Sequence, residues 1–99
     1  IGTRTISFLA KEFNKPLYVC SSSLKFDPLT VFGYEEVIEQ RNPIEVWNKT
    51  FKNLEIKNPA FDRTPMKNIK GIITELGVWK PEKFVNFMKK SARKSNLGI

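Results

Sequence analysis

Two short segments carry residues that could hold a phosphate group. Gly2 and Thr3 precede an apolar periodic stretch, so we expect them to open a helix, where free backbone N–H groups and the positive end of the helix dipole favour an anion. Lys25 follows a short apolar run, and its ammonium group could meet a phosphate as a point charge. A plain helix cap and a solvated loop lysine are the structural alternatives.

Cys20 and the absence of histidine limit the chemistry further. Cys20 ends an apolar run and has no basic neighbour in sequence that would favour its thiolate, so we interpret it as structural. Without histidine the chain has no Ser-His-Asp or Cys-His arrangement and no usual zinc site, so we expect no metal, no cofactor and no catalysis by this chain alone. A lone cysteine cannot form an internal disulfide, which favours the cytoplasm.

The charge of the chain is concentrated in its second half. Residues 1–50 hold six Lys/Arg and six Asp/Glu, whereas residues 51–99 hold eleven and four, which accounts for the net charge of +7. A basic half permits an RNA-binding hypothesis. We disfavour a nucleic-acid partner, because lysines near the end of the last expected helix complement its dipole and form an ordinary solvated face.

Hydrophobic spacing predicts the first helix and strand. Ile6, Leu9, Ala10 and Phe13 follow the i, i+3, i+4, i+7 pattern of a helix face that packs inward. Thr3 or Thr5 could cap this helix, and the sequence Asn14-Lys15-Pro16 should end it. Residues 17–20 are then expected to form a short buried strand.

The second half predicts four more elements after an irregular middle with turn signals at residues 26–28 and 32–34. These are a strand at 53–57, a short helix after Thr64-Pro65 with Met66 and Ile69 inward, a strand at 71–75 and a helix at 81–94. Asp62, just before Thr64, could act on that short helix through capping and its dipole. Residues 95–99 are expected to be a frayed tail.

This order predicts an α/β fold with helices on the faces of a mostly parallel sheet, as in part of a three-layer domain. Three strands are few for such a sheet, and the chain opens without Met directly into a structured element. We therefore expect residues 1–94 to be a half-domain whose partner is a missing N-terminal part of the same protein. No apolar run reaches the roughly 18 residues of a membrane span, so no membrane partner is expected.

Six fragments of the sequence, taken in order, resemble one protein family. They are IGT at 1–3, AKEFNKPLYVC at 10–20, KFDP at 25–28, IEQRNPIEV at 38–46, NPAFDRTP at 58–65 and IITELGV at 72–78. The family contains the regulatory subunits of translation initiation factor 2B, ribose-1,5-bisphosphate isomerase and methylthioribose-1-phosphate isomerase. The Lys-Phe pair at 25–26 is more similar to the branch that holds ribose-bisphosphate isomerase and the archaeal factor-2B-like proteins. Family chains are two to three times longer, and this stretch matches their C-terminal part.

The resemblance implies a fold and a divided site. The fold would be the C-terminal half of a Rossmann-like three-layer domain. The isomerases carry their catalytic Cys and Asp, and a substrate-binding Asn-Lys pair, before the segment that matches Ile1, whereas Lys25 matches a substrate lysine. Family subunits pair through this domain, so Pro59, Phe61 and Asp62 are expected at a subunit interface of a homo- or hetero-oligomer.

Three functional hypotheses follow. The first is the C-terminal part of a factor-2B-like subunit that acts in assembly and regulation and carries part of a pocket for a sugar phosphate or nucleotide. The second is the C-terminal half of an aldose–ketose isomerase whose catalytic residues lie upstream. The third, an RNA-binding domain, depends on charge alone.

Overall fold

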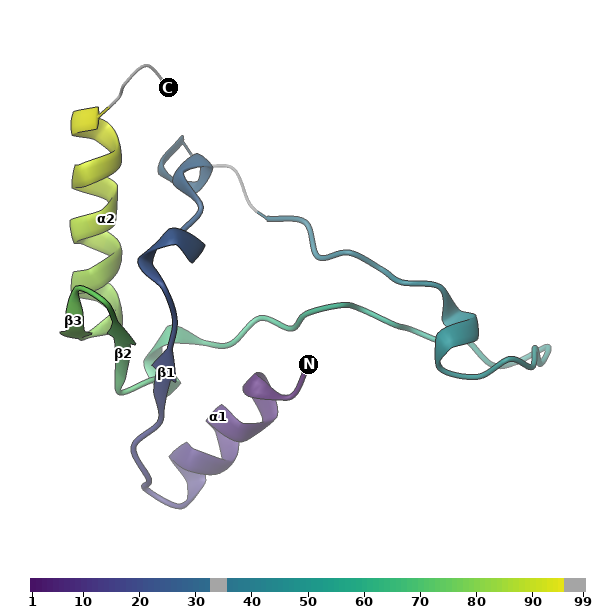
Figure 1. Ribbon diagram of the computed structural model, residues 1–99. Coiled ribbons are helices and arrows are strands. Elements are labelled where there is room, and N and C mark those ends of the chain that lie inside the picture. Colours follow the sequence, from purple (N-terminus) through teal and green to yellow (C-terminus); the bar gives the residue numbers. More distant parts are fainter. Residues whose placement is uncertain (33–35, 96–99) are drawn as a thin grey trace.

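The computed structural model describes residues 1–32 and 36–95. Its helices and strands are α1 (Thr3–Glu12), β1 (Tyr18–Cys20), β2 (Gly71–Thr74), β3 (Gly77–Trp79) and α2 (Pro81–Ser95) (Figure 1). Four 3₁₀ turns complete the described elements: η1 (Ser23–Lys25), η2 (Pro28–Phe32), η3 (Pro43–Glu45) and η4 (Met66–Asn68). The turn expected around Gly33 and the tail after Ser95 fall outside these ranges. No helix in the described ranges is long and apolar enough to cross a bilayer.

The three strands form one mixed sheet in the order β1-β2-β3. β1 and β2 are parallel, with Val19 opposite Ile72, whereas β2 and β3 are antiparallel, with Ile73 opposite Val78. The expectation of a mostly parallel sheet was therefore wrong, since one of the two strand pairs is antiparallel. The cause is local: only residues 75 and 76 join β2 to β3, and so short a connection can only reverse the chain.

Four of the predicted elements are confirmed as helix or strand, namely α1, β1, β2 and α2, and two are not. The expected burial of β1 was wrong, since Tyr18 and Cys20 are exposed and Val19 is half-buried. The strand predicted at 53–57 was wrong, because this segment lies in an extended loop without a continuous partner strand. The helix predicted after Thr64 is only the 3₁₀ turn η4, which has no side-chain cap. Strand formation ends it early: Ile69 is already extended, and Lys70 donates its N–H to the Leu17 carbonyl at 2.8 Å.

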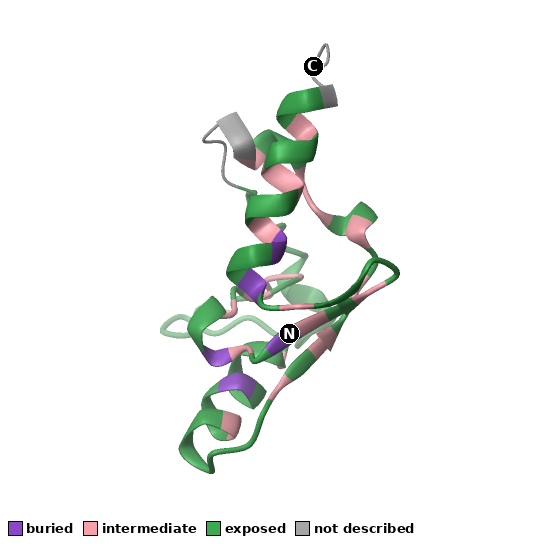
Figure 2. Cartoon of the chain, turned by 90° about the vertical axis from the view of Figure 1, so that its left-hand side faces the viewer, coloured by how far each residue is buried: buried purple, intermediate pink, exposed green. Residues whose placement is uncertain are grey.

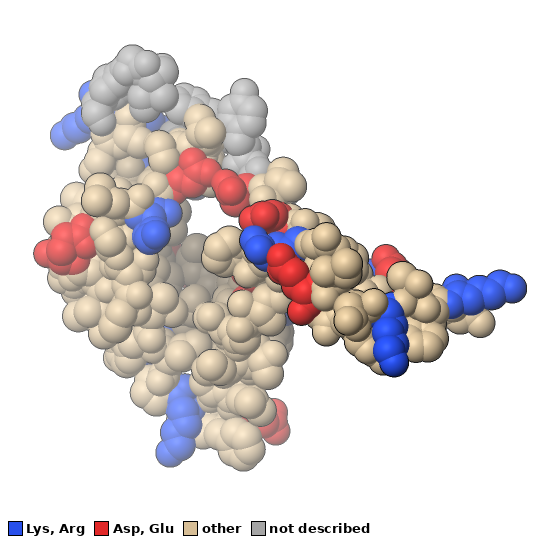
Figure 3. All heavy atoms as spheres, turned by 45° about the vertical axis from the view of Figure 1, so that its right-hand side comes forward, with Lys and Arg blue, Asp and Glu red and all other residues tan. Residues whose placement is uncertain are grey.

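Residues 36–60 form an arm that projects from the body of the molecule and returns to it (Figure 1). Two backbone hydrogen bonds join its two sides, from the Arg41 N–H to the Asn58 carbonyl and from the Ala60 N–H to the Glu39 carbonyl, both at 2.8 Å. Both signs of charge lie along it (Figure 3). Near its tip, the rings of Trp47 and Phe51 pack with their centroids 5.0 Å apart. The arm contributes to a radius of gyration of 17.2 Å, against about 13 Å for a compact domain of this length.

The core of the chain is small (Figure 2). Among the described residues, Phe84 of α2 is the one large apolar side chain that is buried, and it packs against Trp79 with the ring centroids 6.1 Å apart. The accessible surface is 8143 Å², whereas a compact protein of this mass exposes roughly 5,800 Å². Much apolar surface is therefore left uncovered.

The apolar face of α1 is part of that uncovered surface. We expected Ile6, Leu9, Ala10 and Phe13 to face inward. Ala10 is half-buried, but Ile6, Leu9 and Phe13 are 54%, 54% and 67% exposed. Ser7 is the buried residue of the helix, and its hydroxyl accepts a 3.4 Å hydrogen bond from the Asn68 side chain. The helical spacing was correct, but α1 contacts the rest of this chain through its polar side.

Replacing Phe84 with Ala should remove most of this core and lower the free energy of unfolding by about 3 kcal/mol or more. The matched control is Phe13→Ala, which truncates the same side chain at a position that is 67% exposed and should cost far less. Urea unfolding followed by circular dichroism measures both. Equal losses in the two variants would contradict this assignment of the core.

Candidate functional site

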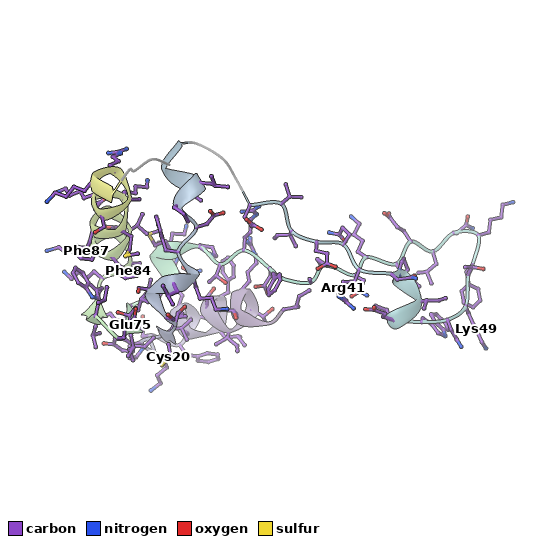
Figure 4. All side chains as sticks on the ribbon, turned by 45° about the horizontal axis from the view of Figure 1, so that its top comes forward. Cys20, Arg41, Lys49, Glu75, Phe84 and Phe87 are labelled. Carbon is purple, nitrogen blue, oxygen red and sulfur yellow. The ribbon has the colours of Figure 1, made fainter. Side chains whose placement is uncertain are left out.

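The first candidate site lies where β1 and β2 end. Because these strands are parallel, Cys20 and Thr74 end at the same edge of the sheet, which we call the carboxyl edge. The Ser21 N–H continues the pairing beyond β1 by donating to the Ile73 carbonyl at 2.9 Å. Figure 4 labels two residues at this edge: Cys20, the last residue of β1, and Glu75, which directly follows β2. Open α/β sheets bind ligands outside the carboxyl ends of their strands.

Glu75 fixes the loop that presents Lys25. The Ser23 N–H donates to both carboxylate oxygens of Glu75 at 3.0 Å, and the Ser23 hydroxyl donates to one of them. The Ser23 hydroxyl and N–H hold the pKa of the Glu75 carboxyl below its ordinary value. Within the turn, the Ser22 hydroxyl accepts the Leu24 N–H at 3.1 Å. The turn η1 is therefore attached to the β2–β3 connection, 52 residues away in sequence.

Lys25 is the last residue of η1 and has an exposed side chain. Its N–H donates to the Ser22 carbonyl at 3.0 Å, which fixes the backbone. Within the described ranges its ammonium group has no ion-pair partner. A fixed backbone and an unpaired charge at the carboxyl edge suit a phosphate ligand, so the assignment of Lys25 stays a prediction with a structural basis.

The start of α1 is held by Asp62. Its Oδ2 accepts the Gly2 N–H at 2.8 Å and the Arg4 N–H at 3.4 Å, so a carboxylate 60 residues away caps the helix. We expected Thr3 or Thr5 to supply this cap, but Gly2 occupies the N-cap position and no side-chain cap comes from the helix itself. Asp62 does cap a helix, as we proposed, but the helix is α1.

The electrostatics at this helix start follow from that contact. The Gly2 N–H, and to a smaller extent the Arg4 N–H, hold the pKa of the Asp62 carboxyl below its ordinary value. The carboxylate also lies at the positive end of the α1 dipole. A phosphate brought to Gly2 and Thr3 would meet this negative charge, so these two residues remain a prediction that the geometry makes less favourable than Lys25.

Arg4 adds a second attachment for α1. Its Nη1 donates to the Arg63 carbonyl at 2.8 Å, and its guanidinium lies 5.3 Å from the centre of the Phe8 ring. The glycine at position 2 has a conformational reason, since its φ of 123° is one that other residues rarely adopt. Asp62 and Arg4 together fix α1 to residues 62–63.

The structure brings some predicted residues together and separates others. Gly2, predicted for phosphate binding, contacts Asp62, predicted for an interface, whereas Lys25 contacts neither of them in the described ranges. Pro59 pairs with Gln40 at the base of the arm, and Phe61 is 67% exposed. The interface assignment of these residues stays a prediction.

Two residues were missed by the sequence analysis. Glu75 has a recognisable signal, because a carboxylate directly after an apolar strand stands at the edge where ligand loops gather. Arg4 has none, since its partner is a backbone carbonyl 59 residues away. Cys20 is exposed and unpaired, and no group of three or more metal-ligating side chains is found within residues 1–32 and 36–95.

Removing the Asp62 carboxylate should destabilise the fold in a pH-dependent way. Because the folded-state pKa is lowered, the contribution is present above the unfolded carboxyl pKa of about 4 and is lost as the pH falls through the folded-state value. Asp62→Ala should therefore lower the urea midpoint near pH 7, and the difference from wild type should shrink towards about pH 3. The control is Glu12→Gln, which removes one exposed carboxylate charge from the other end of α1. A pH-independent difference would contradict the charge-assisted cap.

Known proteins are similar to this chain in sequence. Residues 1–81 match the initiation factor 2 subunit family. The chain is 42% identical over 84 residues to ribose 1,5-bisphosphate isomerase of Methanocaldococcus jannaschii, covering 83% of this chain and 27% of that protein. It is also 42% identical over 94 residues to methylthioribose-1-phosphate isomerase of Thermoanaerobacter sp. strain X514, covering 90% and 27%.

Two solved structures resemble the fold. The delta subunit of translation initiation factor eIF-2B from A. fulgidus aligns with a TM-score of 0.70 and 36% identity, over 91% of this chain and 28% of that one. 5-Methylthioribose 1-phosphate isomerase from Pyrococcus horikoshii aligns with a TM-score of 0.68 and 29% identity, over 92% and 27%. The chain thus spans about a quarter of the length of these relatives. It belongs to the initiation factor 2 subunit family.

Proposed function

We propose that this chain is the C-terminal part of a sugar-phosphate isomerase of this family and supplies one wall of the substrate site. The observation that carries the proposal is the unpaired, exposed Lys25 at the carboxyl edge of the sheet. Relatives named as isomerases of phosphorylated sugars, 42% identical to the chain, support it. This favours the second hypothesis of the sequence analysis over the first.

In this proposal the chain binds and positions the substrate, and its partner segment performs the chemistry. The Lys25 ammonium would contact a substrate phosphate as a point charge. Glu75 is a positioning residue, since it holds η1 through Ser23. Converting an aldose phosphate to a ketose phosphate requires proton transfers between neighbouring carbons, and the family resemblance assigns those to a Cys and an Asp upstream of residue 1.

The exposed apolar face of α1 supports a docking role for the rest of the protein. Ile6, Leu9 and Phe13 together form a stripe more than half exposed, next to a helix start that is already fixed by Asp62. Covering apolar surface of this kind is favourable by roughly 25 cal/mol per Å². We propose that the upstream part of the protein covers it and completes the site against the carboxyl edge.

A factor-2B-like regulatory subunit is the second candidate. Its specific support is the similarity to the eIF-2B delta structure, at 36% identity and a TM-score of 0.70. In that role the site at the carboxyl edge would bind a sugar phosphate or nucleotide without turnover. Subunit assembly would use Pro59, Phe61 and Asp62. Both candidates would act in the cytoplasm.

A chimera tests the proposal. This chain would replace the matching segment of the Methanocaldococcus jannaschii ribose 1,5-bisphosphate isomerase, and conversion of ribose 1,5-bisphosphate would be measured. We expect an active chimera in which Lys25→Ala lowers kcat/KM by about ten- to a hundredfold, because one charged contact to phosphate is lost. Lys49→Ala, which removes an exposed lysine of the arm, should leave activity unchanged (Figure 4).

The outcomes separate the two candidates. A folded chimera that binds ribose 1,5-bisphosphate but does not convert it would favour the regulatory subunit. An active chimera that is insensitive to Lys25→Ala would overturn the role of Lys25.

A further inference from the structure

A cleft opens at the edge of the sheet opposite the carboxyl edge, where β1 and β2 begin. Its volume is about 930 Å³, and residues of both helices, all three strands and η4 line it. Five lysines are among these lining residues: Lys11, Lys15, Lys67, Lys70 and Lys80. We call it the lysine cleft. It is distinct from the carboxyl edge that carries Lys25, because it lies at the other end of the parallel strands.

The lysines of this cleft come from separate parts of the chain. Lys11 belongs to α1 and Lys67 to η4, while Lys15, Lys70 and Lys80 lie just before β1, β2 and α2. Glu82 is the one acidic residue that lines the cleft. None of the five ammonium groups has an ion-pair partner in the described ranges. Clustered like charges repel one another, and a concave surface of one sign attracts a counter-charged partner.

The floor of the cleft is apolar. Trp79 packs against Phe87 with ring centroids 5.0 Å apart, and its Nε1 donates to the Leu76 carbonyl at 3.1 Å. The ring of Tyr18 lies against Gly71, where a Cβ would come within 2.9 Å of it. Both aromatic side chains are thus engaged by their own chain. They form an apolar floor against which an apolar side chain of a partner can rest.

One further feature favours a peptide over a nucleic acid. Arginine, whose planar fork recognises phosphates, is absent from the lining, and lysine provides only point charges.

We propose that the lysine cleft binds an acidic segment of a partner protein. Carboxylates of the segment pair with the lysines at the rim, and an apolar side chain rests against Trp79 and Val78. This surface makes no use of Lys25 or of the carboxyl edge, so it is independent of the sugar-phosphate function.

Fluorescence anisotropy of a labelled peptide tests the proposal on the full chain. The probe is a short peptide in which glutamates alternate with leucines, and its control has glutamine in place of each glutamate. We expect the acidic peptide to bind, the control peptide to bind at least about tenfold more weakly, and added salt to weaken the difference.

Two triple variants of equal net charge show where the peptide binds. Lys15, Lys67 and Lys80 are changed to Glu in one, and the arm residues Lys49, Lys52 and Lys57 in the other. The cleft variant should lose about tenfold or more in affinity and the arm variant should keep it. A set with Gln at the three cleft positions and matching circular dichroism excludes unfolding as the cause.

Two results would overturn the proposal. Equal losses in the cleft and arm variants would mean that the peptide responds to net charge alone. Tighter binding of a single-stranded RNA than of the acidic peptide, abolished by the same cleft changes, would identify the surface as a nucleic-acid site.

Discussion

The contact between Asp62 and the start of α1 organises the described part of the fold. One carboxylate oxygen accepts two backbone N–H groups from a helix that begins 60 residues earlier, and it does so at the positive end of the helix dipole. The contact fixes the loop at residues 58–65 against α1, which in turn precedes β1. β2 follows the same loop, and its parallel pairing with β1 defines the two edges of the sheet.

The two edges have different chemistry. At the carboxyl edge, Glu75 binds Ser23 and so holds η1. It forms no ion pair with Lys25, whose charge is unpaired among the described residues. At the other edge, five lysines surround an apolar floor. The core of the chain is small and lies around Phe84. The exposed apolar stripe on α1 is evidence for a further packing partner. We therefore propose that this chain is a platform with one incomplete sugar-phosphate site and one separate basic cleft.

Local patterns predicted the elements well where local forces decide them. The spacing of Ile6, Leu9 and Phe13 located α1, and proline at its first position located α2. The patterns failed where distant contacts decide. Burial of α1 was assigned to the wrong face because its apolar side has no partner within this chain. The cap by Asp62 and the clamp by Glu75 each join residues more than 50 positions apart, so short-range signals could not identify their partners.

The central claim is that Lys25 meets a sugar phosphate at the carboxyl edge of the sheet. A crystal structure of the chimera with a bound, unreactive analogue of ribose 1,5-bisphosphate tests it most directly. The account predicts the Lys25 Nζ within about 3 Å of a phosphate oxygen, with Ser23 still bonded to Glu75. An analogue bound with both phosphates away from η1, and Lys25 left in solvent, would contradict it.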